Sequence, residues 1–308
     1  MSGSGPIRIG VDLGGTKLLV EALDVEGQVV ASRLTATPRH DYEATLAAIT
    51  ELVGEVEGEL GDKAPVGIGI PGSICPANGL VQNANSVWLN GQPFQQDICR
   101  HLHRDVRVAN DANCFVLSEA LDGAGVGAAS VFGVIMGTGI GGGLVVDERL
   151  IDGPRGIGGE WGHCGLPFPS ADEVSGAPKC WCGRRGCLES WISGPALVAR
   201  FNKSAGMNVL RVEDITALAA EGDAVASMTL LAHTDRVARG LAMVVNVFDP
   251  EVIVLGGGLS ELDHLYGQLP DLMRPHIFSD APAVDIRRPK YGATSGVRGA
   301  ARLWPLSP

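Results

Sequence analysis

The stretch "IRIGVDLGGTKLLVEAL" (residues 7–23) indicates the architecture of the chain, because its pattern returns later in the sequence. Its apolar first half is typical of a buried strand, "GGT" predicts a turn, and "KLLVEAL" predicts a return strand. The stretch "SVFGVIMGTGIGGGLVV" (residues 130–146) has the same order of strand, glycine turn and strand. Internal similarity of this kind predicts two related α/β domains.

Each copy of the pattern is followed by a predicted helix and a further strand. After the first copy, "QVVASRL" completes a three-stranded meander, residues 43–60 have apolar positions at helical spacing, and "PVGIGIPG" (65–72) predicts a buried strand. After the second copy, a long helical stretch (224–247) precedes "EVIVLGGG" (251–258), a strand that ends in glycines. The repeat therefore includes the connection from helix to strand.

The length of 308 residues exceeds the usual size of a single hydrophobic core, so two domains are expected. We place a small N-terminal α/β domain at residues 1–115 and a large C-terminal α/β domain at residues 116–294, with a cleft between them. The residues at 295–308 are expected to form a terminal helix that joins the first domain.

Composition argues against several classes of protein. The net charge of −11 disfavours nucleic acid and anionic lipid as partners. The start, "MSGSGPIRIG", lacks the apolar core of a signal peptide, and the most apolar run (131–146) is too short and too rich in glycine to span a membrane. We expect a cytoplasmic protein, in which clustered cysteines favour a metal site over disulfides.

Glycine-rich turns end three predicted strands and suggest a nucleotide site. In "DLGGTK" (12–17), the glycines would let backbone N–H groups approach phosphate oxygens, Thr16 would donate its hydroxyl, and Asp12 could hold a hydrated Mg²⁺. An ordinary hairpin turn with a solvated Lys17 is the alternative. The "GTG" turn (137–139) in the second copy favours a nucleotide site over an ordinary hairpin turn. The "GGG" run (256–258) would offer a flat surface for adenine. The predicted ATP-binding residues are Asp12, Gly14, Gly15, Thr16, Lys17, Gly137, Thr138, Gly139, Gly256, Gly257 and Gly258.

Asp111 is the candidate catalytic residue. It lies in "RVANDANCFVLSEA" (107–120), where a short strand is expected to pass into a helix. Aspartate is also a common helix N-cap, which is the alternative interpretation. Phosphoryl transfer to a hydroxyl needs a carboxylate near the attacking oxygen, and Asp111 is the best-placed residue for that role.

The segment 158–190 holds a predicted metal site. His163, Cys180, Cys182 and Cys187 give the spacing H-x16-C-x-C-x4-C, and one histidine with three thiolates is a tetrahedral zinc set. Four protein ligands close the coordination shell, so the zinc should be structural. Cys164 is a rival ligand, and unbound buried cysteines are the alternative.

Two glutamates lie close to these predicted ligands in the sequence. Glu160 precedes His163 by three residues, and Glu189 follows Cys187 by two. Folding around zinc would bring both carboxylates to one place, where His163 could donate its second ring N–H. Such a group suits the hydroxyls of a sugar. If the segment does not fold around zinc, the alternative interpretation is that each glutamate is a solvated surface acid.

The motifs "DLGGTK", "NDAN", "GTGIGGG", "GEWGH" and "CWCGRRGCLES" together resemble the ROK family of sugar kinases and repressors. The resemblance implies the duplicated actin-like ATPase (ribonuclease H-like) fold, a structural Zn²⁺, a homodimer, and phosphorylation of a hexose by ATP with Mg²⁺. It also implies that Asp111 is the general base and that the sugar is contacted by Asn110, Glu160, His163 and Glu189.

Within this family, "IPGSICP", "NANSVWLNGQPF" and "GEWGH" are most similar to bacterial fructokinases of the manno(fructo)kinase type. The resemblance therefore implies conversion of D-fructose to fructose 6-phosphate. Glucokinase, mannokinase and N-acetylglucosamine kinase activities are alternatives, and "NDANCF" and "LSEA" also resemble the last of these. A sugar-responsive repressor would need a DNA-binding region ahead of the first strand, which is expected to begin near Ile7.

Overall fold

The computed structural model describes residues 7–305, which fall into two units by their contacts. The first unit extends to Ala129 and also includes Gly143–Gly159 and the residues from Pro289 onward. The second unit comprises Ser130–Gly142 and Glu160–Arg288. The C-terminal segment thus belongs with the N-terminal unit.

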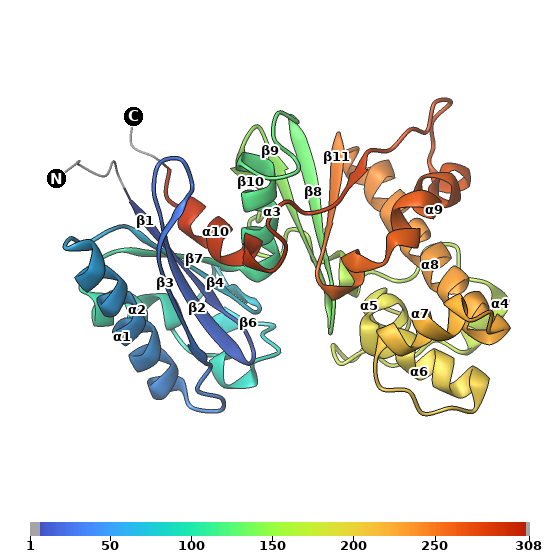
Figure 1. The fold of residues 1–308 in the computed structure, drawn as a ribbon, viewed down its shortest axis with the longest axis horizontal. Coiled ribbons are helices and arrows are strands. Elements are labelled where there is room, and N and C mark those ends of the chain that lie inside the picture. Colours follow the sequence, from blue (N-terminus) through green and yellow to red (C-terminus); the bar gives the residue numbers. More distant parts are fainter. Residues whose placement is uncertain (1–6, 306–308) are drawn as a thin grey trace. The chain divides into compact units, whose positions relative to one another are not determined.

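The first unit is built on a five-stranded sheet with the strand order β3-β2-β1-β4-β7 (Figure 1). The predicted meander is confirmed, because β1 pairs antiparallel with β2 and β2 with β3. The other two strands run parallel to β1, so the carboxyl ends of β1, β4 and β7 meet at one edge. The bounds are Arg8–Leu13 for β1, Lys17–Leu23 for β2, Val29–Ala36 for β3, Val66–Ile70 for β4 and Val106–Asn110 for β7.

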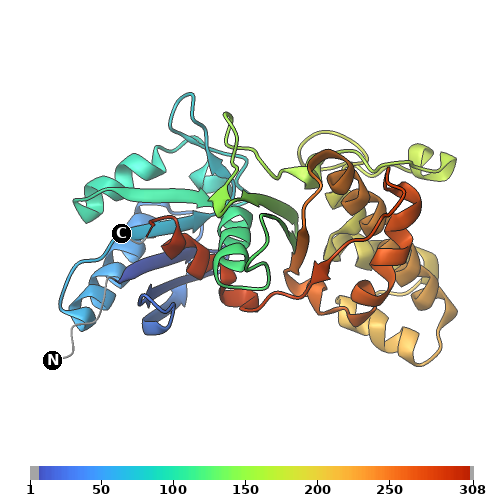
Figure 2. The same ribbon diagram turned by 90° about the horizontal axis from the view of Figure 1, so that it is seen from above.

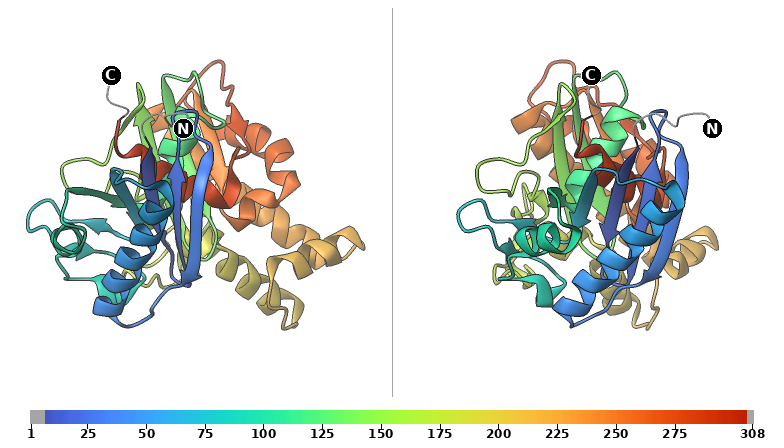
Figure 3. Two further views of the ribbon diagram at one scale, coloured as in Figure 1. Left: turned by 60° about the vertical axis from the view of Figure 1, so that its left-hand side comes forward. Right: turned by 90° about the vertical axis from the view of Figure 1, so that its left-hand side faces the viewer.

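The two faces of β1 pack against different helices. Ile9, Val11 and Leu13 are fully buried in one apolar core with helices α1 (Tyr42–Leu60) and α2 (Phe94–Leu102), which lie beside the sheet in Figure 3. The opposite face carries Gly10, where a Cβ atom would lie 1.9 Å from the carbonyl oxygen of Val297. Glycine is therefore required here, because the backbone of helix α10 touches the strand.

Helix α10 (Ser295–Arg302) packs closely against helix α3 (Asp111–Leu121), as Figure 2 shows. A Cβ atom at Gly299 would lie 1.6 Å from the carbonyl oxygen of Cys114. The buried guanidinium of Arg298 pairs with Asp122 at 3.1 Å, and the buried carboxylate of Glu119 accepts the hydroxyl of Ser295 at 2.7 Å. These contacts fasten the C-terminal helix to α3, whose first residue is Asp111.

The second sheet repeats the topology of the first. Its order β10-β9-β8-β11-β12 matches β3-β2-β1-β4-β7 strand for strand, and β11 runs parallel to both β8 and β12. The predicted repeat is therefore confirmed at the level of the sheets. The bounds are Ser130–Met136 for β8, Ile140–Val146 for β9, Arg149–Leu150 for β10, Val252–Gly256 for β11 and Ile286–Arg287 for β12.

The second unit also contains a layer of helices. The long helix α8 (Ala224–Phe248) begins where Asp223 accepts the N–H of Ala226, and it buries Leu230 in a cluster with Leu197 and Phe201. The other helices of this unit are α4 (Ala171–Ser175), α5 (Glu189–Ile192), α6 (Gly194–Ala205), α7 (Val212–Ala220) and α9 (Asp263–Met273).

Short elements complete the chain. Strands β5 (Ser73–Ile74) and β6 (Val81–Gln82) pair as a small hairpin, and one-turn 3₁₀ helices include Val87–Leu89, Trp161–His163 and Gly258–Glu261. Among the helices described between residues 7 and 305, none has the length and apolar character needed to cross a membrane.

Candidate active site

The first glycine turn joins β1 to β2 as the sequence predicts. The N–H of Gly14 donates to the carbonyl of Lys17 at 2.9 Å, and the hydroxyl of Thr37 donates to the carbonyl of Gly14 at 2.7 Å. Gly15, Thr16 and Lys17 are exposed at the tip. An exposed turn held in this way can present backbone N–H groups and the Thr16 hydroxyl to an anion.

Two carboxylates of the first unit interact at the edge where its parallel strands end. Asp12 lies near the end of β1, and Asp111 follows the last residue of β7. Burial raises the pKa of Asp12 to about 7, and the negative charge of Asp111 adds to this effect. Neighbouring carboxylates that repel each other favour a cation, and one or two carboxylates with water and phosphate suit Mg²⁺.

Asn110 is the N-cap of helix α3, which is the role that the sequence offered as the alternative for Asp111. The side-chain oxygen of Asn110 accepts from the N–H groups of Ala112 and Asn113, and its amide donates to the carbonyl of Gly72 at 3.0 Å. Asp111 is the first residue of α3, and its carboxylate accepts the N–H of Ala112 at 2.8 Å. Helix α3 therefore holds Asp111 in position, while Asn110 serves as the N-cap of that helix.

The second unit brings four potential metal ligands together. The ligand atoms of His163, Cys180, Cys182 and Cys187 all lie within 4.8 Å of one another. Nδ1 of His163 is 3.6 Å from Sγ of Cys180, and the sulfurs of Cys182 and Cys187 are also 3.6 Å apart. This separation is far too long for a disulfide, but it matches the edge of a zinc tetrahedron, which is about 3.5–3.8 Å. The donor set therefore fits a zinc ion.

Local backbone structure holds these ligands in position. Isolated bridges pair Gly165 with Cys187 and Lys179 with Arg185, and Gly183 makes a tight turn with φ of 89°. Burial raises the pKa of the thiols of Cys180 and Cys187, so a bound cation would be needed to keep them as thiolates. Cys164 is exposed and is not part of this group of ligand atoms.

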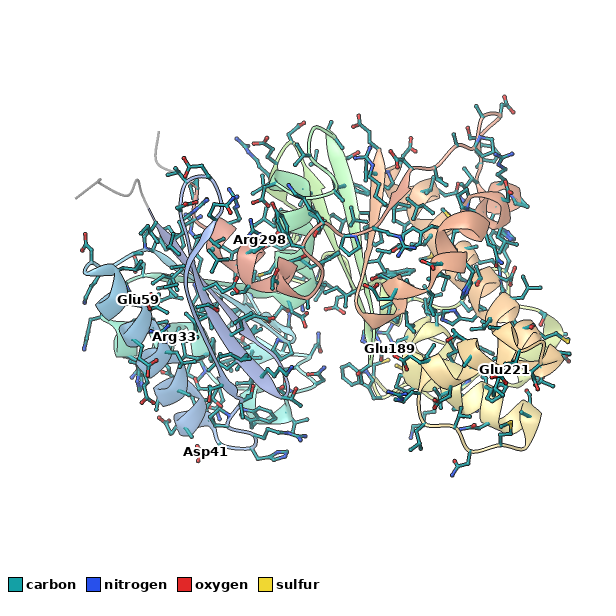
Figure 4. The ribbon with its side chains drawn as sticks, viewed as in Figure 1. Arg33, Asp41, Glu59, Glu189, Glu221 and Arg298 are labelled. Atoms are coloured by element: carbon teal, nitrogen blue, oxygen red, sulfur yellow. The ribbon has the colours of Figure 1, made fainter. Side chains whose placement is uncertain are left out.

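Glu160, a candidate sugar-binding residue, interacts electrostatically with two others, His163 and Glu189. Burial raises the pKa of Glu160, while His163 opposes this shift and Glu189 adds to it. Glu189 begins helix α5 and is labelled in Figure 4. Its Oε2 atom accepts the N–H of Ile140 at 3.0 Å, and its Oε1 atom accepts the indole N–H of Trp181 at 2.6 Å.

The contact between Glu189 and Ile140 brings Glu189 next to the second glycine turn. Ile140 immediately follows the second glycine turn (137–139), and a Cβ atom at Gly139 would lie 2.9 Å from Oε2 of Glu189. The structure thus places the carboxylate of Glu189 against the turn for which the sequence predicts phosphate binding. Sequence reasoning did not anticipate the role of Trp181 in this arrangement, because an indole contact leaves no local signature.

Helix α5 is held by a buried histidine of α8. Nε2 of His233 lies 2.9 Å from the carbonyl oxygen of Ile192, so this nitrogen carries the proton and donates it. His233 is 1% exposed, and burial lowers its pKa to about 4. The neutral imidazole therefore anchors the end of the short helix that begins with Glu189.

Acidification is expected to weaken this anchor. The unfolded chain binds a proton at His233 near pH 6.5 and the folded chain only near pH 4, so stability falls as the pH drops through this range. The difference corresponds to about 3 kcal/mol of unfolding free energy. Denaturant unfolding of wild type and His233→Gln at pH 7 and pH 4 would test this, with a weaker pH dependence expected for the variant. Equal pH dependence in both proteins would contradict it.

A cavity of about 880 Å³ lies beside the second glycine turn. Gly137, Thr138 and Gly258 line it, so two of the predicted nucleotide-binding turns share one cavity. The sequence did not predict the rest of its wall, which includes residues of α6, α7 and the segment between them, such as Asn202, Asn208 and Arg211. The volume is in the range of small-molecule sites.

Comparisons with known proteins found relatives that cover nearly the whole chain. The model of the ROK family matches residues 8–306. An N-acetyl-D-glucosamine kinase of Pectobacterium atrosepticum is 38% identical over 297 residues, which cover 96% of this chain and 97% of that protein.

Two solved structures extend the comparison. A ROK hexokinase from Thermus thermophilus superposes with a TM-score of 0.84 at 33% identity, covering 96% of both chains. A ROK family glucokinase from Streptomyces griseus, in complex with glucose and AMPPNP, superposes with a TM-score of 0.77 at 28% identity, covering 96% of this chain and 98% of that one.

Proposed function

Because the chain belongs to the ROK family, we propose that it transfers the γ-phosphoryl group of ATP to the primary hydroxyl of a hexose. The observation that carries the proposal is the hydrogen bond from the N–H of Ile140 to Glu189, which connects one candidate sugar-binding acid to a candidate phosphate-binding turn. A sugar kinase must hold both substrates close together, and this contact joins the two sets of residues within one unit.

The nucleotide is assigned to the glycine turns and to the cavity beside the second of them. The cavity lined by Gly137, Thr138 and Gly258 would take the adenosine, and the exposed turn Gly14–Thr16 would bind phosphate oxygens. The Streptomyces griseus relative was solved with an ATP analogue, which supports ATP as the donor. Mg²⁺ would accompany the nucleotide, with Asp12 as the carboxylate that holds it.

The sugar is assigned to Asn110, Glu160, His163 and Glu189, with Asp111 as the general base. The hydroxyl proton passes to the Asp111 carboxylate as the oxygen bonds to the γ-phosphorus, and ADP leaves with the electrons of the broken bond. The resemblance also leads us to include a homodimer in the proposal.

A structural zinc ion completes the site. His163, Cys180, Cys182 and Cys187 would hold it, and coordination through Nδ1 leaves Nε2 of His163 free to donate to a sugar hydroxyl. The metal's contribution is to fix the loop, because four protein ligands leave no position for water. The proposed chemistry therefore depends on protein side chains that this loop orients.

The relatives point to N-acetyl-D-glucosamine as the acceptor. Proteins named N-acetyl-D-glucosamine kinase reach 38% identity over nearly the whole chain, whereas the sequence motifs alone indicated D-fructose. We propose the amino sugar as the preferred substrate and keep fructose, glucose and mannose as the alternatives. A one-hydroxyl or acetyl difference is discriminated by pocket hydrogen bonds, which motifs do not determine.

A coupled ADP-release assay with these four sugars tests the proposal. The highest kcat/KM is expected with N-acetyl-D-glucosamine, and the product should carry phosphate at its primary hydroxyl. Turnover with fructose alone would restore the motif-based prediction. Absence of turnover with every sugar, combined with retarded migration of DNA in a gel shift, would favour the repressor alternative.

A further inference from the structure

The side chain of Trp181 is exposed, yet its indole N–H makes a hydrogen bond to a carboxylate of the proposed sugar site. It lies between the metal-ligand candidates Cys180 and Cys182, and its side chain is 60% exposed. Large aromatic side chains are usually buried, so an exposed indole with a fixed orientation is unusual. The fixed end is the indole N–H, which donates to Oε1 of Glu189 at 2.6 Å.

The ring of Trp181 also contacts His163. The two ring centroids are 5.0 Å apart, and the planes meet at 83°, which is an edge-to-face arrangement. Trp181 thus touches two of the residues assigned to the sugar. Its position is set by both of them and by the turns around the cysteines.

Trp181 and the backbone together orient the Glu189 carboxylate. One oxygen accepts the indole N–H, and the other accepts the N–H of Ile140. Sγ of Cys180 also lies 3.9 Å from Oε1, so Oε2 is the oxygen that keeps a lone pair for a further donor, because a carboxylate oxygen can accept two hydrogen bonds. Removing the indole donor would take away the shorter of the two contacts of Oε1, and the carboxylate of Glu189 could then reorient toward water.

We propose that Trp181 is a positioning and specificity-determining residue of the sugar site. Its N–H holds Glu189 in the orientation that accepts sugar hydroxyls, and its exposed ring provides an apolar face for the less polar surface of the bound sugar. This inference rests on the proposed function. It assigns a role to a residue that is neither a metal ligand nor a predicted contact of the substrate.

Two substitutions separate the two parts of this role. Trp181→Phe keeps an aromatic face and removes the N–H donor, whereas Trp181→Gln keeps a donor and removes the face. The matched control is Trp304→Phe, because the Trp304 indole also donates a hydrogen bond, at 2.7 Å to the carbonyl of Val66. Val66 is the first residue of β4, whereas Asp12 and Asp111 lie by the carboxyl ends of the strands.

The wild-type protein is first assayed with N-acetyl-D-glucosamine, glucose, fructose and mannose, and the sugar with the highest kcat/KM is used throughout. Trp181→Phe is expected to raise KM about tenfold or more, as for the loss of a hydrogen bond to a charged group, with kcat changed less than about threefold. Trp181→Gln should also raise KM. Trp304→Phe should leave both constants within about twofold of wild type.

Intrinsic fluorescence and zinc content distinguish positioning from a merely structural role. Sugar should change the tryptophan emission of the wild type and of Trp304→Phe but not of Trp181→Phe, while all three keep the same zinc content. Unchanged KM in both Trp181 variants overturns the inference, and so does a loss of zinc in both, which would assign Trp181 to folding of the loop. If the wild type phosphorylates no sugar but binds one with a Trp181-dependent emission change, the proposed function fails and the inference stands.

Discussion

Asp111→Asn is expected to lower kcat by about 10³-fold, within the range of 10²–10⁴ that proton transfer to a positioned side chain contributes. The amide cannot take the proton of the attacking hydroxyl, but it has nearly the shape of the carboxylate. The local structure should persist, because Asn110 caps helix α3 and an amide oxygen can still accept the N–H of Ala112. The dissociation constant of the sugar, measured by calorimetry, should change by less than about fivefold.

Asp105→Asn is the matched control for this experiment. Asp105 is exposed and precedes β7, whereas Asp111 follows the same strand, so both variants lose one negative charge at opposite ends of one element. The control should keep the kcat of the wild type. If Asp111→Asn also retains more than about a tenth of the wild-type kcat, Asp111 is not the general base and the assignment of the chemistry is wrong.

The architecture could be predicted because the fold depends on local patterns that occur twice. The turn in "DLGGTK" and its counterpart in "GTGIGGG" both join antiparallel strands, and both sheets have the same strand order. The spacing of His163 and the three cysteines could be interpreted for the same reason. Short separations in the sequence, with glycines at tight turns such as Gly183, restrict where the ligand atoms can lie.

The remaining features depend on contacts between distant segments. Part of the wall of the cavity comes from helices α6 and α7, whose sequences carry only an ordinary amphipathic pattern. The approach of Gly296 to Asp12, at 3.3 Å for an added Cβ atom, requires the C-terminal helix to return to β1. The motifs also could not predict which sugar is preferred, because they reflect the chemistry shared by the family rather than the shape of one pocket.

Cys182→Ser is expected to remove both the bound metal and a large part of the stability of the second unit. Wild-type protein should contain about one zinc ion per chain, and the variant well under half of that, because serine is a poor zinc ligand. Zinc binding contributes about 10–16 kcal/mol in zinc-finger peptides, so even partial loss should lower the unfolding free energy by several kcal/mol. Elemental analysis and calorimetric melting measure the two effects on the same preparation.

Cys164→Ser gives the control and also distinguishes the rival ligand. Cys164 neighbours His163 in the sequence, but it is exposed and lies outside the group formed by His163, Cys180, Cys182 and Cys187. The same chemical change at this position should therefore leave zinc content and melting temperature unaltered. If Cys164→Ser loses zinc and Cys182→Ser keeps it, the ligand set is wrong. A different metal-ligand set would then have to position Glu160 and Glu189 near His163, because the proposed zinc ion would connect the segments that carry these three residues.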